Sequence, residues 1–288
     1  MKMPEKKKFT GLSQYKIPYC YELAGKKFHI VMDGGAEYLM DFTDEETVTI
    51  FQEGKAVSFE RYECLKGDDR TYLVHWTPKK HQGKINCALV IDLWQSLVTF
   101  VNFETGYDPE YPRLIRITPY FGAIKTAGEP LPAFRHHLSA RMNGKHVQWR
   151  YMPGISLQHI YFSPNALRAS GGPGAKKADQ KGPEWYPFFE EPCFHIYISE
   201  SLNLFCFFEE NRMRRCPDHS EGGSGLLLLQ DIDRVLDVGI GFNANRFYMV
   251  SAFGEENEIE DPLDKEPSPY DWNTLTSMPT IHWEVSEI

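Results

Sequence analysis

The sequence predicts an all-β protein made of two antiparallel β-barrels in tandem, related by internal duplication. Short runs of aromatic and β-branched residues recur at intervals of roughly ten residues, with turn-forming residues between them. The stretch ALVIDLWQSLVTF (88–100) also has a second version later in the chain, LLLLQDIDRVLDVG (226–239). Aromatic residues make up 14% of the chain, which favours sheets over helices.

The repeat is anchored by one carboxylate in each copy. Asp92 and Asp231 each follow an aliphatic run and precede a second apolar stretch. An Asp at such a place is typical of a turn between strands, because its side chain bonds the backbone that follows. Two further matches support the same alignment: Gly25-Lys26 with Gly144-Lys145, and TYLVHW (71–76) with LNLFCFF (202–208).

The first copy contains seven expected strands, separated by turn formers such as DGG (33–35), KGDD (66–69) and HQGK (81–84). In order they are KKFHIVM, EYLMDF, TVTIF, VSFERYE, TYLVHW, KINCALVI and SLVTFVNF. Seven or eight antiparallel strands in about 100 residues form a barrel or a sandwich. A ladder in which each strand is followed closely by the next favours the up-and-down barrel.

A proline-rich segment from Gly106 to Leu138 separates the copies, and the second set of strands follows it. These are HVQWRYM, LQHIYF, CFHIYIS, LNLFCFFE, GLLLLQ and RFYMVSAF. We expect an N-terminal extension at 1–22, barrels at 23–125 and 139–253, a linker at 126–138 and an acidic extension at 254–288. The second copy is about 20 residues longer, and ASGGPGAKKADQKGPEW (169–185) predicts an exposed, mobile loop there.

Charge, apolar runs and cysteine spacing limit the possible binding partners and the cellular location of the protein. The net charge of -9 argues against nucleic acid, because its binders concentrate positive charge. Residues 255–271 hold eight carboxylates and one lysine, which indicates a solvated tail. No segment reaches the roughly 18 apolar residues of a membrane span, and no apolar run follows the basic MKMPEKKKFT. Six scattered cysteines without CxxC spacing indicate a reduced, cytoplasmic protein.

The chain resembles the molybdenum cofactor biosynthesis protein F (MoaF) family, whose related N- and C-terminal domains are lipocalin-like. The residues that carry the resemblance are VIDLWQSLVTFV in the first half and QHIYFSPN, LFCFFEEN and LLLLQDIDRVLDVGIGF in the second. Where the family has a Trp and a Glu two residues apart, this chain has Phe207 and Glu209. The resemblance implies two tandem lipocalin/calycin-like antiparallel β-barrels, and such barrels are also similar to phenolic acid decarboxylases.

Motifs for cofactors and metals are missing from the sequence. It contains no GxGxxG after a strand, no GxxxxGK[ST], no HExxH and no GxSxG, so we expect no cofactor. GGPGAKK lacks the strand, spacing and helix of a phosphate loop. Cys216, Asp218 and His219 lie too close together to form a tetrahedral site, and adjacent His136 and His137 would point in opposite directions, so we expect no metal.

Polar residues inside the strands of the second copy predict the site. Alternation places His159 and Tyr161 on one face of LQHIYFS, and Phe205, Phe207 and Glu209 on one face of LNLFCFFEEN. Pointing inward, they would form an apolar pocket with a few convergent polar groups. We expect Glu209, His159 and Tyr161 as catalytic residues, and Phe205, Phe207 and Arg212 as ligand-binding residues. Arg212, Arg214 and Arg215 could also attract a carboxylate or phosphate, or simply form an exposed basic turn.

Two classes of function remain open. One is a cofactor-independent lyase or isomerase that moves a proton on an aromatic or phenolic small molecule, with Glu209 or His159 as acid or base. The other is a non-catalytic lipocalin-like binding protein, which the resemblance would make accessory to molybdenum cofactor or monoamine metabolism. The extra loop could close over the second barrel, and the first would serve for packing or homodimerisation. His29 and His75, in the first barrel, are expected as core or surface residues.

Overall fold

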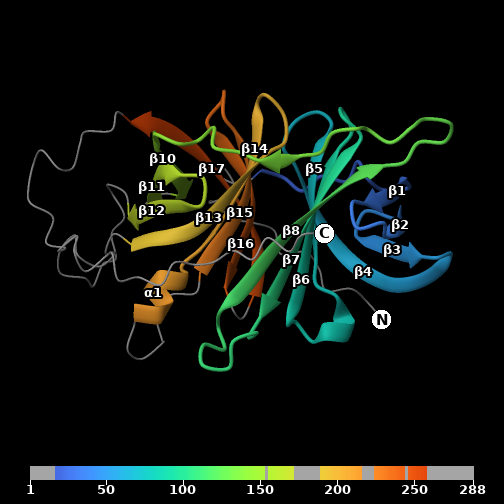
Figure 1. The fold of residues 1–288 in the computed structure, drawn as a ribbon, viewed down its shortest axis with the longest axis horizontal. Helices are drawn as coiled ribbons and strands as arrows, with labels where there is room; N and C mark the ends of the chain where they lie inside the picture. The colour runs from blue at the N-terminus through green and yellow to red at the C-terminus, as the bar shows by residue number, and fades with distance from the viewer. Residues whose placement is uncertain (1–16, 153–154, 172–188, 216–223, 244–245, 258–288) are drawn as a thin grey trace, which may run out of the picture.

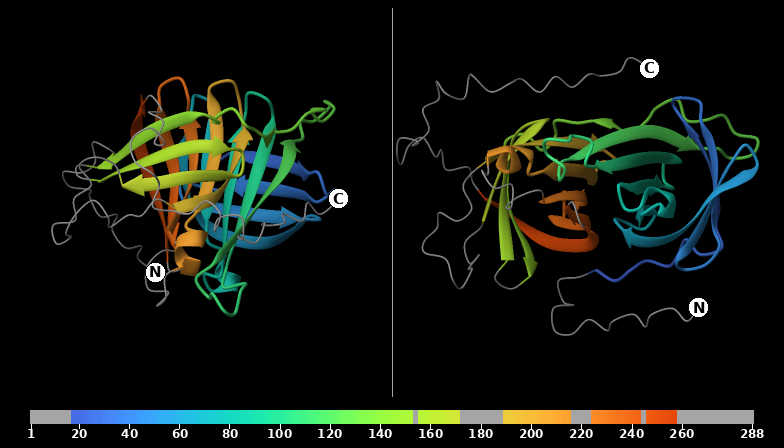
Figure 2. Two further views of the ribbon diagram at one scale, coloured as in Figure 1. Left: turned by 60° about the vertical axis from the view of Figure 1, so that its left-hand side comes forward. Right: turned by 90° about the horizontal axis from the view of Figure 1, so that it is seen from below.

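The computed structural model describes residues 17–152, 155–171, 189–215, 224–243 and 246–257. Over these residues the protein is all-β, with two antiparallel barrels of eight strands that lie side by side (Figures 1 and 2). One short helix, α1 (Glu210–Arg215), and one 3-10 turn (Lys79–His81) complete the described elements. No described helix has the length and apolar character needed to cross a membrane. The predicted fold class is confirmed.

The first barrel is closed by pairing of its first and last strands, β1 and β8. Every other strand pairs with the next one along the chain, as the sequence predicts for an up-and-down barrel. Its strands are β1 (Lys27–Met32), β2 (Glu37–Phe42), β3 (Thr47–Gln52), β4 (Lys55–Lys66), β5 (Thr71–Trp76), β6 (Ile85–Asp92), β7 (Leu97–Thr105) and β8 (Ile115–Ile124).

The second barrel is a ring of the same kind, in which β10 pairs with β17 and every other pair is consecutive. A short strand, β9 (His137–Leu138), joins it from the linker by pairing with β13. The ring consists of β10 (Lys145–Met152), β11 (Ile155–Ser163), β12 (Ala166–Gly171), β13 (Phe189–Tyr197), β14 (Leu202–Phe208), β15 (Ser224–Asp231), β16 (Leu236–Asn243) and β17 (Arg246–Asn257). β17 therefore continues four residues beyond the expected end at residue 253.

The two barrels match in the structure at the positions that the sequence repeat aligns. Gly25 and Gly144 both have positive φ, and each donates its backbone N–H to a residue of the second strand in its own barrel. Asp92 and Asp231 each end the sixth strand of a barrel. Asp92 Oδ1 accepts the backbone N–H of Trp94 at 2.7 Å, and Asp231 Oδ1 accepts that of Arg234 at 2.8 Å. Both carboxylates thus cap the turns that the repeat predicts.

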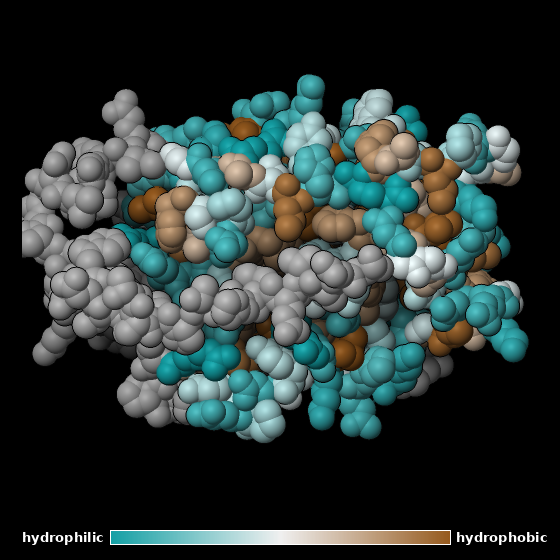
Figure 3. All heavy atoms as spheres, in the orientation of Figure 1, coloured by the Kyte–Doolittle hydropathy of each residue, from teal (hydrophilic) through white to brown (hydrophobic). Residues whose placement is uncertain are grey.

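The barrels are joined through the outward faces of β5–β8 and β13–β17, which form one hydrophobic core. The strands at its centre are buried on both sides: every residue of β5 and of β14 is buried. Such strands consist of continuous apolar runs, because neither face meets water. On the face shown in Figure 3, hydrophobic residues are instead scattered among hydrophilic ones, as is normal for a protein surface.

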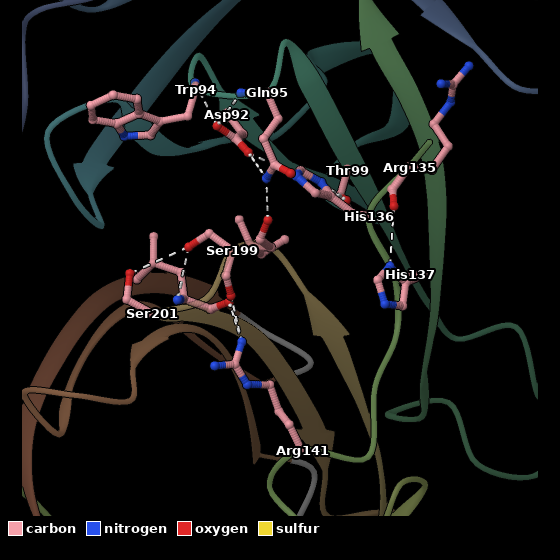
Figure 4. Close-up of polar contacts among 12 residues, drawn as sticks. Asp92, Trp94, Gln95, Thr99, Arg135, His136, His137, Arg141, Ser199 and Ser201 are labelled. Atoms are coloured by element: carbon pink, nitrogen blue, oxygen red, sulfur yellow. Dashed lines mark hydrogen bonds and ion pairs between the residues drawn. The ribbon is translucent and has the colours of Figure 1, made fainter. Parts of the chain in front are cut away.

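Each capped turn also reaches across to the other barrel. Asp92 Oδ2 accepts a hydrogen bond from the Gln95 amide at 2.6 Å, and the same amide donates to the carbonyl of Ile198 in the second barrel at 2.6 Å (Figure 4). Asp231 Oδ2 binds Arg234, whose guanidinium donates to the carbonyl of Gly67 in the first barrel at 3.4 Å. The two contacts are related by the duplication, so the barrels meet as two copies of one self-complementary surface.

His136 attaches the linker to the first barrel. Its ring is buried between Thr99, whose hydroxyl lies 2.8 Å from Nδ1, and Asp92, whose carboxylate lies 3.4 Å from Nε2 (Figure 4). Burial alone would raise the pKa of Asp92, but the hydrogen bonds from His136, Gln95 and the Trp94 backbone outweigh it and hold that pKa below its usual value. Thr99 is fully buried. The contacts of His136 with Asp92 and Thr99 therefore hold the linker against β6 and β7.

The predicted mobile loop lies largely outside the described residues, which end at 171 and resume at 189. Its first residues, Ala169–Gly171, are the end of β12 and pair with β11. The expected lid function of the loop therefore remains a prediction.

Candidate functional site

The interiors of the two barrels differ in chemistry. The first is filled by an apolar cluster that includes Phe28, Phe42, Val74, Trp76 and Leu89. The second combines aromatic and aliphatic side chains with buried polar groups from five strands, β11 and β13–β16. These polar groups are His159 and Tyr161 on β11, His195 on β13, Asn203 on β14, Gln230 on β15 and Asp237 on β16. The second interior is the candidate site.

Tyr161 is the centre of the hydrogen-bond network. Its hydroxyl oxygen accepts hydrogen bonds from the Trp149 indole and the Gln230 amide, both at 3.1 Å. The indole nitrogen can only donate, and the Gln230 nitrogen donates as well, so the hydroxyl proton of Tyr161 is directed to His159 Nδ1, 3.2 Å away. Nδ1 of His159 is therefore the acceptor nitrogen of that ring.

A second branch leads to His195. The amide nitrogen of Asn203 donates to Gln230 Oε1 at 3.3 Å and to His195 Nδ1 at 3.1 Å. His195 Nδ1 must then be an acceptor, and its proton lies on Nε2. Asn203 and Gln230 are direct partners in the β14–β15 ladder, which holds the amides side by side.

The network leaves two imidazole N–H groups unused. With both Nδ1 atoms accepting, His159 and His195 each carry a proton on Nε2, and neither Nε2 has a partner among the described residues. The same is true of Asn203 Oδ1 and Asp237 Oδ1. Buried polar atoms are nearly always paired, because leaving one without a hydrogen bond costs about 1–3 kcal/mol. Four such atoms inside one barrel make this interior the candidate for a ligand site.

Aromatic rings form the walls around these groups. The His195 ring stacks on Phe205 with centroids 4.9 Å apart, and Phe205 stacks on Phe207 at 5.7 Å. His159 meets the edge of Phe207 at 5.2 Å and the edge of Tyr161 at 5.8 Å. Flat aromatic surfaces with a few fixed donors are typical of pockets for planar organic ligands.

Asp237 brings a carboxyl group into the same interior. It is fully buried, it lies next to Gln230 in the β15–β16 ladder, and its Oδ2 is 3.5 Å from the Tyr151 hydroxyl. Burial raises the pKa of Asp237 well above its usual value, against the opposing effect of hydrogen bonds from the Ala252 backbone and Tyr151. Burial thus favours the protonated carboxylic acid, which can both donate and accept.

Burial favours the uncharged forms of the ionisable side chains in this interior. It lowers the pKa of His159 and of His195 to about 3, the neighbouring His195 also contributing at His159, so both rings are neutral at pH 7. It raises the pKa of Tyr161 well above its usual value, against the hydrogen bonds from Gln230 and Trp149. The barrel therefore presents neutral hydrogen-bonding groups.

Four of the six predicted site residues lie together. His159, Tyr161, Phe205 and Phe207 share the interior and contact one another, as the alternation predicts. Glu209 is also buried, but it follows the end of β14. Its carboxylate accepts a hydrogen bond from the Ser224 backbone N–H at 3.4 Å, at the end of the strand.

The basic residues predicted near the site are only partly described. The Arg212 side chain lies outside the described residues, as does that of Arg215. Arg214 pairs with Glu210 at 2.9 Å and with Asp108 of the first barrel at 3.7 Å, and its guanidinium stacks on Tyr111. Arg214 thus bridges the two barrels at the surface.

Sequence reasoning missed His195, Asn203, Gln230, Asp237 and Trp149. The signal was present, because alternation in CFHIY places His195 on the face of Cys193, and alternation in HVQWRYM places Trp149 on the face of Val147. Asp237 follows a turn in DRVLDVG, where a carboxylate is usually exposed.

The histidines of the first barrel lie away from both interiors. His29 is on the outer surface and pairs with Glu37 at 2.7 Å. His75 faces the second barrel, where its ring stacks on Phe247 at 5.4 Å, and burial lowers its pKa to about 4. The part of the chain that the structure describes contains no group of three His, Cys, Asp or Glu residues arranged to hold a metal ion. Cys216, Asp218 and His219 lie outside that part.

Residues 9–104 match the family model of the MoaF N-terminal domain. Most of the first barrel is therefore similar to a MoaF N-terminal domain. The match covers β1–β6 and nearly all of β7, so the resemblance to the MoaF family predicted from the sequence is confirmed there. The polar interior of the second barrel lies outside the matched residues. No curated protein matches the chain.

Proposed function

We propose that this MoaF-like protein binds a small, uncharged aromatic molecule inside its second barrel, as a lipocalin-type binding protein. The observation that carries the proposal is the pair of unused imidazole N–H groups, on His159 and His195, held among stacked aromatic rings. A carbonyl or hydroxyl oxygen of the ligand would accept these hydrogen bonds, and its ring would lie against Phe205 and Phe207.

The charge state supports an uncharged ligand. The two histidines and Tyr161 are neutral at pH 7, and burial favours the uncharged form of Asp237. An ion would lose its hydration on entry and would meet no opposite charge there, a penalty of several kcal/mol. A neutral phenol or aryl ketone gains hydrogen bonds without that penalty.

Calorimetric titration tests the binding proposal. We expect 4-hydroxyacetophenone to bind at pH 6.5, and 4-hydroxybenzoate and tyramine, which carry opposite charges, to bind at least tenfold more weakly. His159→Phe and His195→Phe keep a ring but remove the Nε2 donor together with the Nδ1 acceptor, and each is expected to weaken binding about tenfold, or about 1.4 kcal/mol. His29→Ala, on the outside of the first barrel, is the control and leaves binding unchanged.

A cofactor-independent lyase or isomerase is the second candidate, and Asp237 is the observation that favours it. A protonated carboxylic acid beside a tyrosine hydroxyl can stabilise the oxyanion of an enolate or phenolate as it forms. Such a site would use Asp237 and Tyr151 as donors. His159 has a pKa of about 3 and would be a weak base at neutral pH.

The two candidates differ in what happens to the ligand. Incubation with 4-hydroxyacetophenone and with p-coumarate, followed by mass spectrometry of the small molecules, shows either unchanged ligand or a new product. The binding proposal expects every molecule to be recovered unchanged. A product that depends on Asp237, and disappears in Asp237→Asn, would support the enzyme instead.

A further inference from the structure

The first barrel has a cavity at the end that the N-terminal segment crosses. It has a volume of about 440 Å³ and is lined by that segment, by β4 and β5, and by Phe247 of the second barrel. Two cysteines from different elements, Cys20 of the N-terminal segment and Cys64 of β4, both line it.

The backbone holds the two cysteines side by side. The Cys20 N–H donates to the Cys64 carbonyl at 2.9 Å. Residues hydrogen-bonded across two extended segments have Cα atoms roughly 5–6 Å apart, which lies within the roughly 4.4–6.8 Å that a disulfide spans. Both thiols are free in this structure.

The environments of the two thiols favour different chemistry. A hydrogen bond from the Cys64 thiol lowers the pKa of Cys20 to about 6, with help from the Glu22 backbone and from Lys66 and against burial and the Glu22 carboxylate. The same interaction with Cys20, together with burial, raises the pKa of Cys64. These shifts favour the thiolate of Cys20, which is the nucleophilic form, and the thiol of Cys64.

We propose that Cys20 and Cys64 are a reversible redox site, which hydroperoxides oxidise to a disulfide that fastens the N-terminal segment to β4. The Cys20 thiolate attacks one oxygen of hydrogen peroxide, the O–O bond breaks, and one proton is taken up, giving a sulfenic acid and water. The Cys64 thiol then attacks the Cys20 sulfur and releases a second water. Two thiols lose two hydrogen atoms in total, and one peroxide becomes two waters.

The disulfide would fix a segment that contacts both barrels. The Ile17 N–H donates to the Ser251 hydroxyl of β17 at 3.0 Å, and the Tyr19 hydroxyl donates to Glu63 of β4 at 3.2 Å. Oxidation would therefore tie the segment covalently to β4 in the position that these hydrogen bonds give it, at the edge of the cavity.

The other described cysteines differ from this pair. Burial raises the pKa of Cys87 and of Cys193 to about 12, and it raises that of Cys206 well above its usual value. Each of the three is buried inside a strand, in a barrel interior or between the barrels. They are expected to remain thiols under conditions that oxidise Cys20.

Peroxide oxidation followed by intact-mass and peptide analysis tests the proposal. The full chain carries Cys216→Ser, because Cys216 lies outside the described residues. It is reduced and treated with hydrogen peroxide at pH 7, and its intact mass is measured before the remaining thiols are alkylated for peptide analysis. We expect a loss of about 2 Da, a Cys20–Cys64 peptide pair, and full reversal by dithiothreitol.

Variants distinguish the attack on peroxide, assigned to Cys20, from the closing of the disulfide, assigned to Cys64. With Cys64→Ser, Cys20 should stop at the sulfenic acid and react with dimedone, and with Cys20→Ser, Cys64 should stay a thiol. Cys193→Ser is the matched control and should still form the disulfide. Oxidation that proceeds equally in Cys20→Ser, or a disulfide that joins other cysteines, would overturn the proposal. Circular dichroism of each variant verifies that it is folded.

Discussion

Replacing Tyr161 by Phe removes one oxygen from the centre of the second barrel and leaves the ring in place. Three hydrogen bonds meet at this oxygen: from the Trp149 indole, from the Gln230 amide, and to His159. Each contributes about 1 kcal/mol net, so their loss amounts to about 3 kcal/mol. The two donors that remain are buried and gain no new partner, which makes about 3 kcal/mol a lower bound.

Urea unfolding followed by circular dichroism measures this change as a difference in the free energy of unfolding. The control is Tyr120→Phe, because the Tyr120 side chain is exposed on the first barrel, and we expect a change below about 0.5 kcal/mol. A loss below about 1 kcal/mol in Tyr161→Phe would refute the network, since three buried hydrogen bonds cannot vanish at so small a cost.

Three further predictions concern charge and the barrel interface. The imidazole NMR signals of His159 and His195 should keep the values of the neutral ring from pH 8 down to pH 5, because burial lowers both pKa values to about 3; titration near pH 6.5 would show that the rings are solvated. Gln95→Ala and Arg234→Ala should each cost about 1 kcal/mol or more in urea unfolding, and no loss in either would exclude a contribution of the crossing contacts. Asp92 has a lowered pKa, so its stabilisation is present above about pH 4 and is lost as the pH falls through the folded value. Asp92→Asn should therefore be less stable at pH 7 and lose less stability on acidification than the wild type, and parallel pH profiles would contradict this.

The sequence predicts the barrels well because two local rules act throughout the chain. Alternation along β11 and β14 places His159, Tyr161, Phe205 and Phe207 on one side of the sheet, and the closed ring makes that side the interior. The repeated aspartate predicts a turn, and in both copies the structure has one, at Asp92 and Asp231.

The sequence does not predict the way in which the barrels meet. TYLVHW and LLLLQ are mostly apolar, which indicates burial on both faces, but only the three-dimensional structure shows that each covers the other barrel. The second function of the repeated turns, to direct Gln95 and Arg234 across the interface, depends on that packing.

Glu209 shows a further limit of the pattern. Alternation continues the inward face from Phe207 to Glu209, but β14 ends at Phe208 and α1 begins at Glu210. Glu209 is the first residue after the strand, so the alternation of side chains along β14 no longer fixes the direction of its carboxylate. Asp237 supplies the carboxyl group of the interior instead, from a strand start where sequence alone favours exposure.

The most direct test of a ligand site in the second barrel is an NMR titration of the histidine side chains. With ¹⁵N-labelled histidine, the Nε2–H groups of His159 and His195 should each give a neutral-ring signal, and both should shift when 4-hydroxyacetophenone is added. The account predicts that these two signals shift together and saturate at one ligand per chain, while that of His29 stays in place. Shifts confined to His29 or His75, or none at all across a panel of neutral phenols and aryl ketones, would contradict it.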